Sequence, residues 1–98
     1  MAEYRLSLGA RRDLLDIAAY GAQRFGREQA IRYRDLFKQH FERVAENPQL
    51  YPAVDHLRTG YRRCVCGAHA IYYLSRPDDV LIVRVLGRQD ARRALPDR

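Results

Sequence analysis

The hydrophobic pattern near the start of the chain changes from alternating to helical. Apolar side chains at Tyr4, Leu6 and Leu8 alternate with polar ones, which predicts a short, half-buried strand over residues 3–8. From Ala10 onward, apolar residues recur at steps of three and four, the period of one helix face. The predicted buried stripe comprises Leu14, Ile17, Ala18, Gly21, Ala22 and Phe25, and the predicted solvent face comprises Arg11, Arg12, Asp13, Asp16, Gln23 and Arg24.

A second amphipathic helix is expected directly after Gly26, a residue that suits the C-terminal end of the first. It begins near Arg27 or Glu28 and stops at Asn47-Pro48, because proline disfavours helical backbone in the residue before it. Its predicted apolar stripe comprises Ala30, Tyr33, Leu36, Phe37, Phe41, Val44 and Ala45. Two helices with so short a connection form an antiparallel hairpin. Each has an apolar face that a third element must cover.

The second half of the chain supplies that element as three strand-like runs. A loop with two prolines spans residues 48–60, and the runs that follow it are Tyr61–Cys66, Ala68–Ser75 and Val80–Leu86. Short turns separate the runs, so we expect an antiparallel meander. A short helix over residues 89–95 is expected to follow the last strand.

The element order β-α-α-β-β-β predicts a single α+β domain over residues 1–98, with the helical hairpin on one face of a mostly antiparallel sheet. The opposite face is then expected to be open and available for function. Alternation places Val80, Ile82, Arg84 and Leu86 on one face and Leu81, Val83 and Val85 on the other. We expect Arg84 on the face away from the helices, because an unpaired buried guanidinium is costly. Arg84 is either paired with Asp55 or Asp90, or it is a free cation that awaits a partner.

The charge of the chain indicates an anionic partner. There are 18 basic and 12 acidic residues, a net charge of +6, and every basic residue except Lys38 is arginine, which stays charged at any cellular pH. Residues 48–98 hold nine basic and five acidic groups, against nine and seven in residues 1–47. Such a charge favours binding to nucleic acid or to an acidic protein segment. The predicted basic rim comprises Arg58, Arg62, Arg63, Arg84, Arg88, Arg92 and Arg93.

Side chains suited to catalysis are scarce in this basic half. It contains no lysine, and arginine can stabilise charge but cannot act as a base. His69, at the start of a predicted strand, is the one well-placed candidate base, and a structural role competes with a catalytic one. The pattern therefore favours a binding protein without catalytic residues, metal or cofactor.

Cys64 and Cys66 are predicted to be small buried hydrophobic residues on one face of a strand. The alternative is a zinc site with His69 and the distant His56, which has fewer well-spaced ligands than structural zinc sites use. No apolar run approaches the length of a membrane span, and the first residues do not form a signal peptide. We therefore expect a cytoplasmic protein that does not bind membranes.

Six short motifs follow one another between Tyr4 and Asp90. They are Tyr4-x-Leu6-Ser7, Arg24-Phe25-Gly26-x-x-Gln29-Ala30 followed by Tyr33 and Phe37, Ala45-Glu46-Asn47-Pro48, Leu57-Arg58-x-Gly60-Tyr61-Arg62, Gly67-x-His69-x-Ile71-x-Tyr73, and Ile82-x-Arg84-Val85-Leu86. In this order and spacing they resemble the ParE toxins of bacterial type II toxin–antitoxin modules, within the RelE/ParE superfamily. The resemblance implies the fold predicted above.

The resemblance also implies a function. ParE-like toxins are neutralised by a small ParD-type antitoxin, whose flexible C-terminal segment wraps around the toxin in a hetero-oligomer, and they poison DNA gyrase. RelE-like relatives cut messenger RNA on the ribosome with lysine, histidine or tyrosine near the last strand, and those residues are missing here after Val80. Many ParE sequences carry a histidine where this chain has Gly87.

The charge distribution, the apolar helix faces and the resemblance together predict two binding surfaces. The predicted target-binding residues are Arg84, Arg88, Arg92 and Arg93, and the predicted antitoxin-binding residues are Arg58, Arg62, Leu14, Ala18, Tyr33 and Phe37. Contact with DNA is expected only through the antitoxin. The enzyme alternative is a ribosome-dependent endoribonuclease with His69 as base and Arg84 as phosphate clamp. A third hypothesis is an inactive relative that only binds its antitoxin and helps to repress their promoter.

Overall fold

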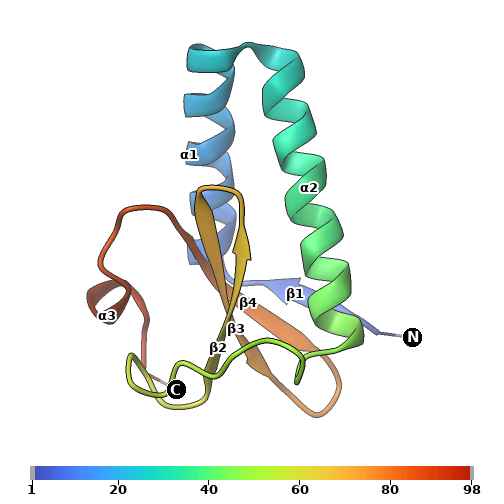
Figure 1. Cartoon of the computed structure of the whole chain (residues 1–98), viewed down its shortest axis with the longest axis vertical. Coiled ribbons are helices and arrows are strands. Elements are labelled where there is room, and N and C mark those ends of the chain that lie inside the picture. Colours follow the sequence, from blue (N-terminus) through green and yellow to red (C-terminus); the bar gives the residue numbers. More distant parts are fainter. Residues whose placement is uncertain (1, 98) are drawn as a thin grey trace.

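The computed structural model describes residues 2–97 and consists of a helical hairpin packed against a four-stranded sheet (Figure 1). The elements are β1 (Tyr4–Leu6), α1 (Leu8–Phe25), α2 (Arg27–Glu46), β2 (Tyr61–Cys66), β3 (His69–Ser75), β4 (Val80–Leu86) and α3 (Ala91–Ala94). The predicted α+β class and the order β-α-α-β-β-β with a short C-terminal helix are confirmed. The last helix is shorter than predicted, because it starts only after Asp90, whose side chain caps it.

The strands are arranged in the order β1-β4-β3-β2. The predicted meander is confirmed, since β2 pairs antiparallel with β3, and β3 pairs antiparallel with β4. β1 lies parallel to the other side of β4, with Tyr4 opposite Val80 and Leu6 opposite Ile82. The start of the chain is thereby held beside its last strand.

Local sequence signals explain where the two long helices begin and end. Ser7 caps α1, because its Oγ accepts a hydrogen bond of 3.0 Å from the Ala10 amide. The same Oγ donates to the Val83 carbonyl at 2.5 Å, which ties the cap to β4. Gly26 separates α1 from α2 with a φ of +91°, a conformation that other residues rarely adopt. The reversal between the helices therefore depends on glycine.

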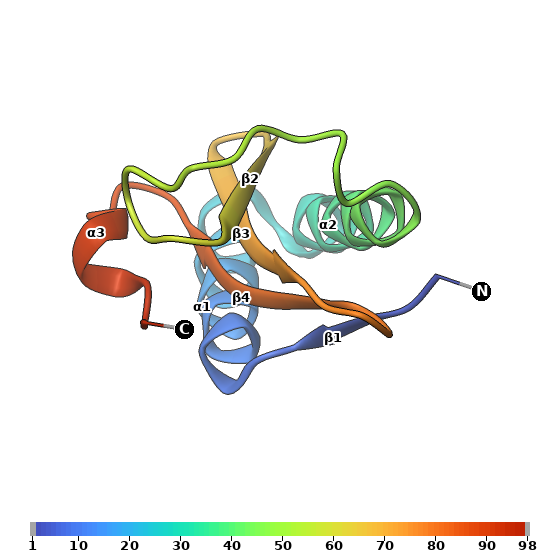
Figure 2. The same cartoon turned by 90° about the horizontal axis from the view of Figure 1, so that it is seen from below.

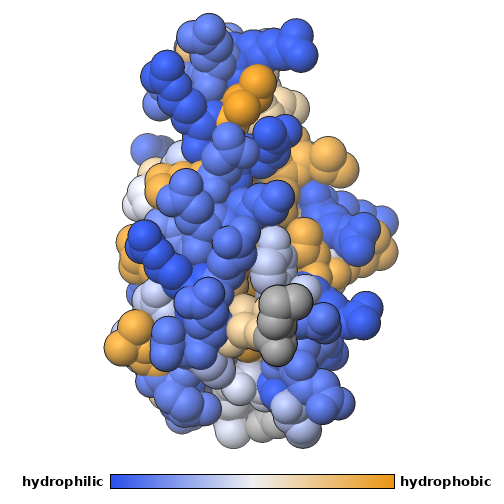
Figure 3. Space-filling view, turned by 90° about the vertical axis from the view of Figure 1, so that its right-hand side faces the viewer, coloured by the Kyte–Doolittle hydropathy of each residue, from blue (hydrophilic) through white to orange (hydrophobic). Residues whose placement is uncertain are grey.

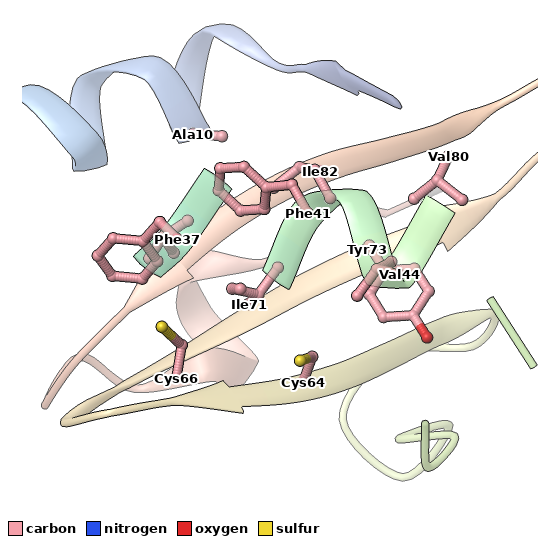
Figure 4. Close-up of a cluster of buried hydrophobic side chains, with 11 residues drawn as sticks. Ala10, Phe37, Phe41, Val44, Cys64, Cys66, Ile71, Tyr73, Val80 and Ile82 are labelled. Carbon is pink, nitrogen blue, oxygen red and sulfur yellow. The ribbon is translucent and has the colours of Figure 1, made fainter. Parts of the chain in front are cut away.

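The main core lies between the helical hairpin and one face of the sheet (Figure 4). Its aromatic members Phe37 and Phe41 come from α2, and Tyr73 from β3. The buried residues of this cluster are Ala10, Phe37, Phe41, Val44, Cys64, Cys66, Ile71, Tyr73, Val80, Ile82 and Val85. Burial of Cys64 and Cys66 confirms that both are core residues.

The opposite face of the sheet is covered, so the prediction of an open face is wrong. A second core forms there between the strands, the 48–60 loop and the segment that contains α3. Its buried residues are Val54, Tyr61, Ala70, Tyr72, Val83, Leu86 and Leu95. In Figure 2 the loop runs from the end of α2 across to the side on which α3 lies. Strands with apolar residues on both faces need cover on both sides. The 48–60 loop and the segment that contains α3 cover this second face of the sheet.

A β-bulge in β4 overturns the predicted division of its side chains. The register with β3 shifts between Tyr72 and Tyr73, so that Arg84 is opposite Tyr72 while Ile82 is opposite Tyr73. The residue between them is extra, and it reverses the alternation along the strand. Val80 and Ile82 consequently face the helices, contrary to the prediction, whereas Val85 faces them as predicted.

The far end of the helical hairpin projects beyond the sheet (Figure 1). The predicted stripe of α1 is therefore buried only in part: Leu14 and Ile17 pack against the core, whereas Phe25 is 63% exposed. The side of the molecule on which α2 lies is largely hydrophilic (Figure 3). Within residues 2–97, no helix combines the length and apolarity needed to cross a membrane.

Candidate partner-binding site

An ion pair links the first helix to the last strand. The Arg84 guanidinium donates to both carboxylate oxygens of Asp13, at 2.7 and 2.8 Å. The Val85 amide also donates to Asp13, at 2.9 Å, and Arg84 reaches the Ala94 carbonyl at 3.3 Å. Such bidentate, charge-assisted bonds are strong and directional. The hydrogen bonds that Arg84 donates to Asp13 are the main cause that raises the pKa of Arg84.

This ion pair corrects two predictions. The structural partner of Arg84 is Asp13, and not Asp55 or Asp90. The helical period predicts Asp13 on the solvent face of its helix, yet Asp13 is buried, with 7% of its surface exposed. A lone carboxylate is rarely buried unless it is paired, and no local pattern showed that a cation 71 residues away would reach it.

A close backbone approach accompanies the pair. A Cβ atom added to Gly9 would lie 2.9 Å from Cδ of Arg84 and 3.4 Å from its Nε. Glycine at this position therefore leaves room for the arginine to pass along the start of α1. Sequence reasoning missed Gly9, because a glycine in the first turn of a helix has no distinctive signature.

Tyr33 of α2 and His69 of β3 form a second polar contact. The Tyr33 hydroxyl lies 2.7 Å from Nδ1 of His69 and 3.1 Å from the Cys66 carbonyl, and it accepts a bond of 3.2 Å from the Ala68 amide. Burial is the main cause that lowers the pKa of His69, and the charge of Asp13 opposes it. The tyrosine thus fastens the β2–β3 turn to α2.

Two of the predicted antitoxin-binding arginines hold the chain together. Arg62 donates to the Tyr51 carbonyl at 2.6 Å and to the Gln49 side chain at 2.7 Å. Arg58 donates to the Leu95 carbonyl at 3.3 Å and lies 3.3 Å from the Asp97 carboxylate. These contacts fasten the 48–60 loop and the C-terminal segment to the second core.

The other predicted antitoxin-binding residues differ in how deeply they are buried. Phe37 is 1% exposed and belongs to the main core, so its assignment to a surface is wrong. Leu14 and Ala18 on α1 and Tyr33 on α2 are partly buried, and each retains some accessible surface. The helical period explains the difference, since Phe37 points toward the sheet.

An apolar stripe on the outer face of α1 was missed by sequence reasoning. Leu8 and Leu15 are 64% and 71% exposed and lie seven residues apart, which places them on one side of the helix. Exposed Ala19 and Ala22 continue this face, and exposed Arg11 and Arg12 flank it. The signal was present in the sequence: Leu8, Leu15 and Ala19 recur at helical spacing beside the predicted stripe, which shares Ala22 with this face.

The predicted target-binding arginines divide into one anchored and three exposed side chains. Arg84 is held by Asp13 and Ala94. Arg88, Arg92 and Arg93 are exposed, at the end of β4 and on α3. Arg88 lies between β4 and α3, which begins only at Ala91, whereas Arg92 and Arg93 belong to α3 itself.

The two cysteines of β2 lie in the main core and, within the described part of the chain, do not have the surroundings of a metal site. Burial raises the pKa of Cys66 to about 11, which favours the protonated thiol over a metal-binding thiolate. Among residues 2–97, no three histidine, cysteine or acidic side chains converge as a metal site.

Comparisons with known proteins show which class this chain belongs to, the toxins of type II toxin–antitoxin systems. Residues 4–92 match the family described as "ParE toxin of type II toxin-antitoxin system, parDE". The Toxin ParE1 of Caulobacter vibrioides (strain ATCC 19089 / CIP 103742 / CB 15) is 44% identical over 73 residues, which cover 74% of this chain and 76% of that protein. The Toxin ParE1 of Mycobacterium tuberculosis (strain CDC 1551 / Oshkosh) is 33% identical over 96 residues, which cover 96% and 98%.

The fold is also similar to a solved structure titled "Chromosomal ParDE TA system from P. aeruginosa". The TM-score is 0.78 at 13% identity, over 91% of this chain and 98% of the other. The chain belongs to the ParE family of type II toxins.

Proposed function

We propose that this ParE-family toxin inhibits DNA gyrase by protein–protein contact and is neutralised by a ParD-type antitoxin. The observation that carries the antitoxin half is the exposed apolar face of α1, bordered by Arg11 and Arg12. An amphipathic acidic segment fits such a surface, because its apolar residues bury the stripe and its carboxylates pair with the guanidinium groups. Leu14 and Ala18 extend this docking surface toward the sheet.

The target-binding half of the proposal rests on the C-terminal segment. Arg88, Arg92 and Arg93 are exposed there, while Arg84 holds the segment to α1 through Asp13 and Ala94. Three guanidinium groups on a short, anchored stretch suit an acidic surface on a target protein. In this proposal Arg84 is a positioning residue, and the three exposed arginines make the contacts.

The enzyme alternative has weaker support from the same geometry. Its phosphate clamp, Arg84, already has bidentate bonds to Asp13, and phosphate would have to displace that carboxylate. Discrete, ribosome-dependent messenger cuts that disappear in His69→Ala would favour the alternative.

A supercoiling assay tests the proposal. Purified toxin at micromolar concentration should inhibit gyrase, and the product of the adjacent gene should relieve the inhibition. Full supercoiling activity with well-folded toxin would count against gyrase as the target. Failure of the adjacent gene product to bind would count separately against the antitoxin half.

A further inference from the structure

The contacts of the Tyr33 hydroxyl determine where His69 carries its proton. This hydroxyl has one hydrogen and three neighbours: the Cys66 carbonyl at 3.1 Å, the Ala68 amide at 3.2 Å and Nδ1 of His69 at 2.7 Å. The carbonyl only accepts and the amide only donates. All three contacts are satisfied only if Nδ1 carries a hydrogen, donates it to Tyr33, and leaves the hydroxyl hydrogen for Cys66.

The other ring nitrogen, Nε2, is consequently the one with the lone pair in neutral His69. Within residues 2–97 Nε2 has no hydrogen-bond partner, and it is not among the fully buried polar atoms. It faces Gly87, where an added Cβ would lie 3.3 Å from it. Glycine therefore leaves this nitrogen uncovered at the end of β4.

The surroundings hold the ring in one orientation. Tyr33 bonds its inner nitrogen, and the Phe37 ring packs against it edge-on at 5.8 Å between centroids. The contact joins α2 to the β2–β3 turn, which lies beside the helical hairpin (Figure 1). Because the His69 ring is already held in one orientation, it loses little conformational entropy when a partner binds its Nε2 lone pair.

We propose that Nε2 of His69 is a binding site for an uncharged hydrogen-bond donor, a hydroxyl or an amide N–H, of the antitoxin polypeptide. This inference rests on the proposed function, because it assigns one contact of the antitoxin. A cationic donor is disfavoured by the net charge of +6 and by the pairing of Asp13 with Arg84. A carboxylate would require an imidazolium, which burial of the ring opposes.

The first test needs only the toxin. Long-range ¹⁵N–¹H NMR spectra should show His69 with hydrogen on Nδ1 and a free Nε2. His40 is the internal control, because its Nδ1 lies 2.9 Å from the Leu36 carbonyl and must carry hydrogen. Tyr33→Phe should shift His69 toward the other tautomer and leave His40 unchanged. A wild-type His69 with hydrogen on Nε2 would overturn the proposal.

The second test uses two isosteric variants and the product of the adjacent gene. His69→Asn keeps a side-chain amide near the position of Nδ1 and removes Nε2, whereas His69→Gln places its amide oxygen near the position of Nε2. We expect Kd to rise about tenfold for His69→Asn, and by less than about threefold for His69→Gln. Thermal unfolding of each variant shows whether it is folded. Equal effects of the two folded variants would overturn the docking role.

The third test separates neutral donors from carboxylates. The charged or titratable groups around His69 are Asp13 on α1 (which is paired with Arg84), Tyr33 on α2 and Cys66 on β2. Protonation of Nε2 removes its lone pair, so affinity should fall as pH drops through the pKa of His69, which burial lowers from its ordinary value, and His69→Gln should lack this dependence. Tighter binding at low pH that depends on His69 would overturn the proposal in favour of a carboxylate. Absence of any complex would overturn the proposed function and the docking role together, while the NMR result would stand.

Discussion

The carboxylate of Asp13 and the guanidinium of Arg84 meet through two hydrogen bonds across 71 positions of sequence. The pair is asymmetric in exposure, since the side chain of Asp13 is 7% and that of Arg84 26% exposed. Asp13 also accepts from the Val85 amide within the bulged part of β4. One carboxylate therefore fixes the start of α1, the bulge and the segment that leads to α3.

Removing the charge of Asp13 should destabilise the fold. In Asp13→Asn the guanidinium of Arg84 loses its counter-charge while it remains half-buried, and we expect a loss of about 2–4 kcal/mol in the free energy of unfolding. Urea denaturation monitored by circular dichroism measures it. The double variant Asp13→Asn with Arg84→Met should recover much of the loss, because the asparagine oxygen can still accept from the Val85 amide while no guanidinium is left unpaired. A single variant as stable as the wild type would contradict a structural role for the pair.

Two glycines of α1 should respond in opposite directions to alanine. Gly9→Ala would force its Cβ to 2.9 Å from Arg84, so we expect a loss of about 1–2 kcal/mol. The Cβ of Gly21→Ala would lie 3.7 Å from that of Ala30, an ordinary contact, and should gain about 0.5–1 kcal/mol from helix propensity. The denaturant midpoint of each variant, compared with that of the wild type, shows whether the substitution stabilises or destabilises the fold. A gain in both variants would show that helix propensity alone governs these positions, and a loss in Gly21→Ala would contradict the open space beside it.

The exposed face of α1 should contribute to binding of the adjacent gene product and not to the folding stability of the toxin. Leu15→Glu should weaken the complex with the adjacent gene product by at least about 30-fold, as expected for loss of a central apolar contact. Leu50→Glu is the matched control, since Leu15 and Leu50 are 71% and 72% exposed. Both variants should stay within about 0.5 kcal/mol of wild-type stability. Isothermal titration calorimetry that finds equal Kd values for the two variants would contradict the docking surface.

The C-terminal arginines should matter for gyrase inhibition and not for antitoxin binding. We expect the triple variant Arg88→Glu, Arg92→Glu, Arg93→Glu to need at least about ten times more toxin for half-inhibition of supercoiling. The exposed arginines at the hairpin tip offer a control with the same change of charge, Arg24→Glu, Arg27→Glu, Arg32→Glu. Loss of inhibition in the control alone would move the target surface to the tip.

Alkaline pH should destabilise the fold through the core thiols. The pKa of Cys66 rises with burial from 9.0 to about 11. Between these values the unfolded thiol loses its proton before the folded one does. Folding stability is thus fully present below pH 9 and falls as pH rises to about 11, by about 2–3 kcal/mol for this group. In Cys66→Ala, urea midpoints measured from pH 8 to 11 should fall less steeply; an unchanged slope would rule out the thiol as the cause.

The hydrophobic period alone predicted most of the elements, because it reports local geometry. Gly26 and Asn47 mark helix ends, and the turn between β3 and β4 follows from its proline and acidic residues. The candidate site was harder to predict. Arg88, Arg92 and Arg93 proved to be exposed, whereas Phe37 proved to be core, because a helical stripe does not show how deep each of its members lies.

The sequence by itself determined the helical hairpin, the meander, the positive charge and the family motifs, since each of these depends on neighbours in the chain or on simple composition. The tertiary structure decided the rest: that Asp13 is buried against Arg84, that a bulge reverses the faces of β4, and that a loop and tail cover the second face of the sheet. It also decided which nitrogen of His69 is free. Each of these depends on groups far apart in sequence meeting in space, where the cost of an unpaired buried polar group selects one arrangement.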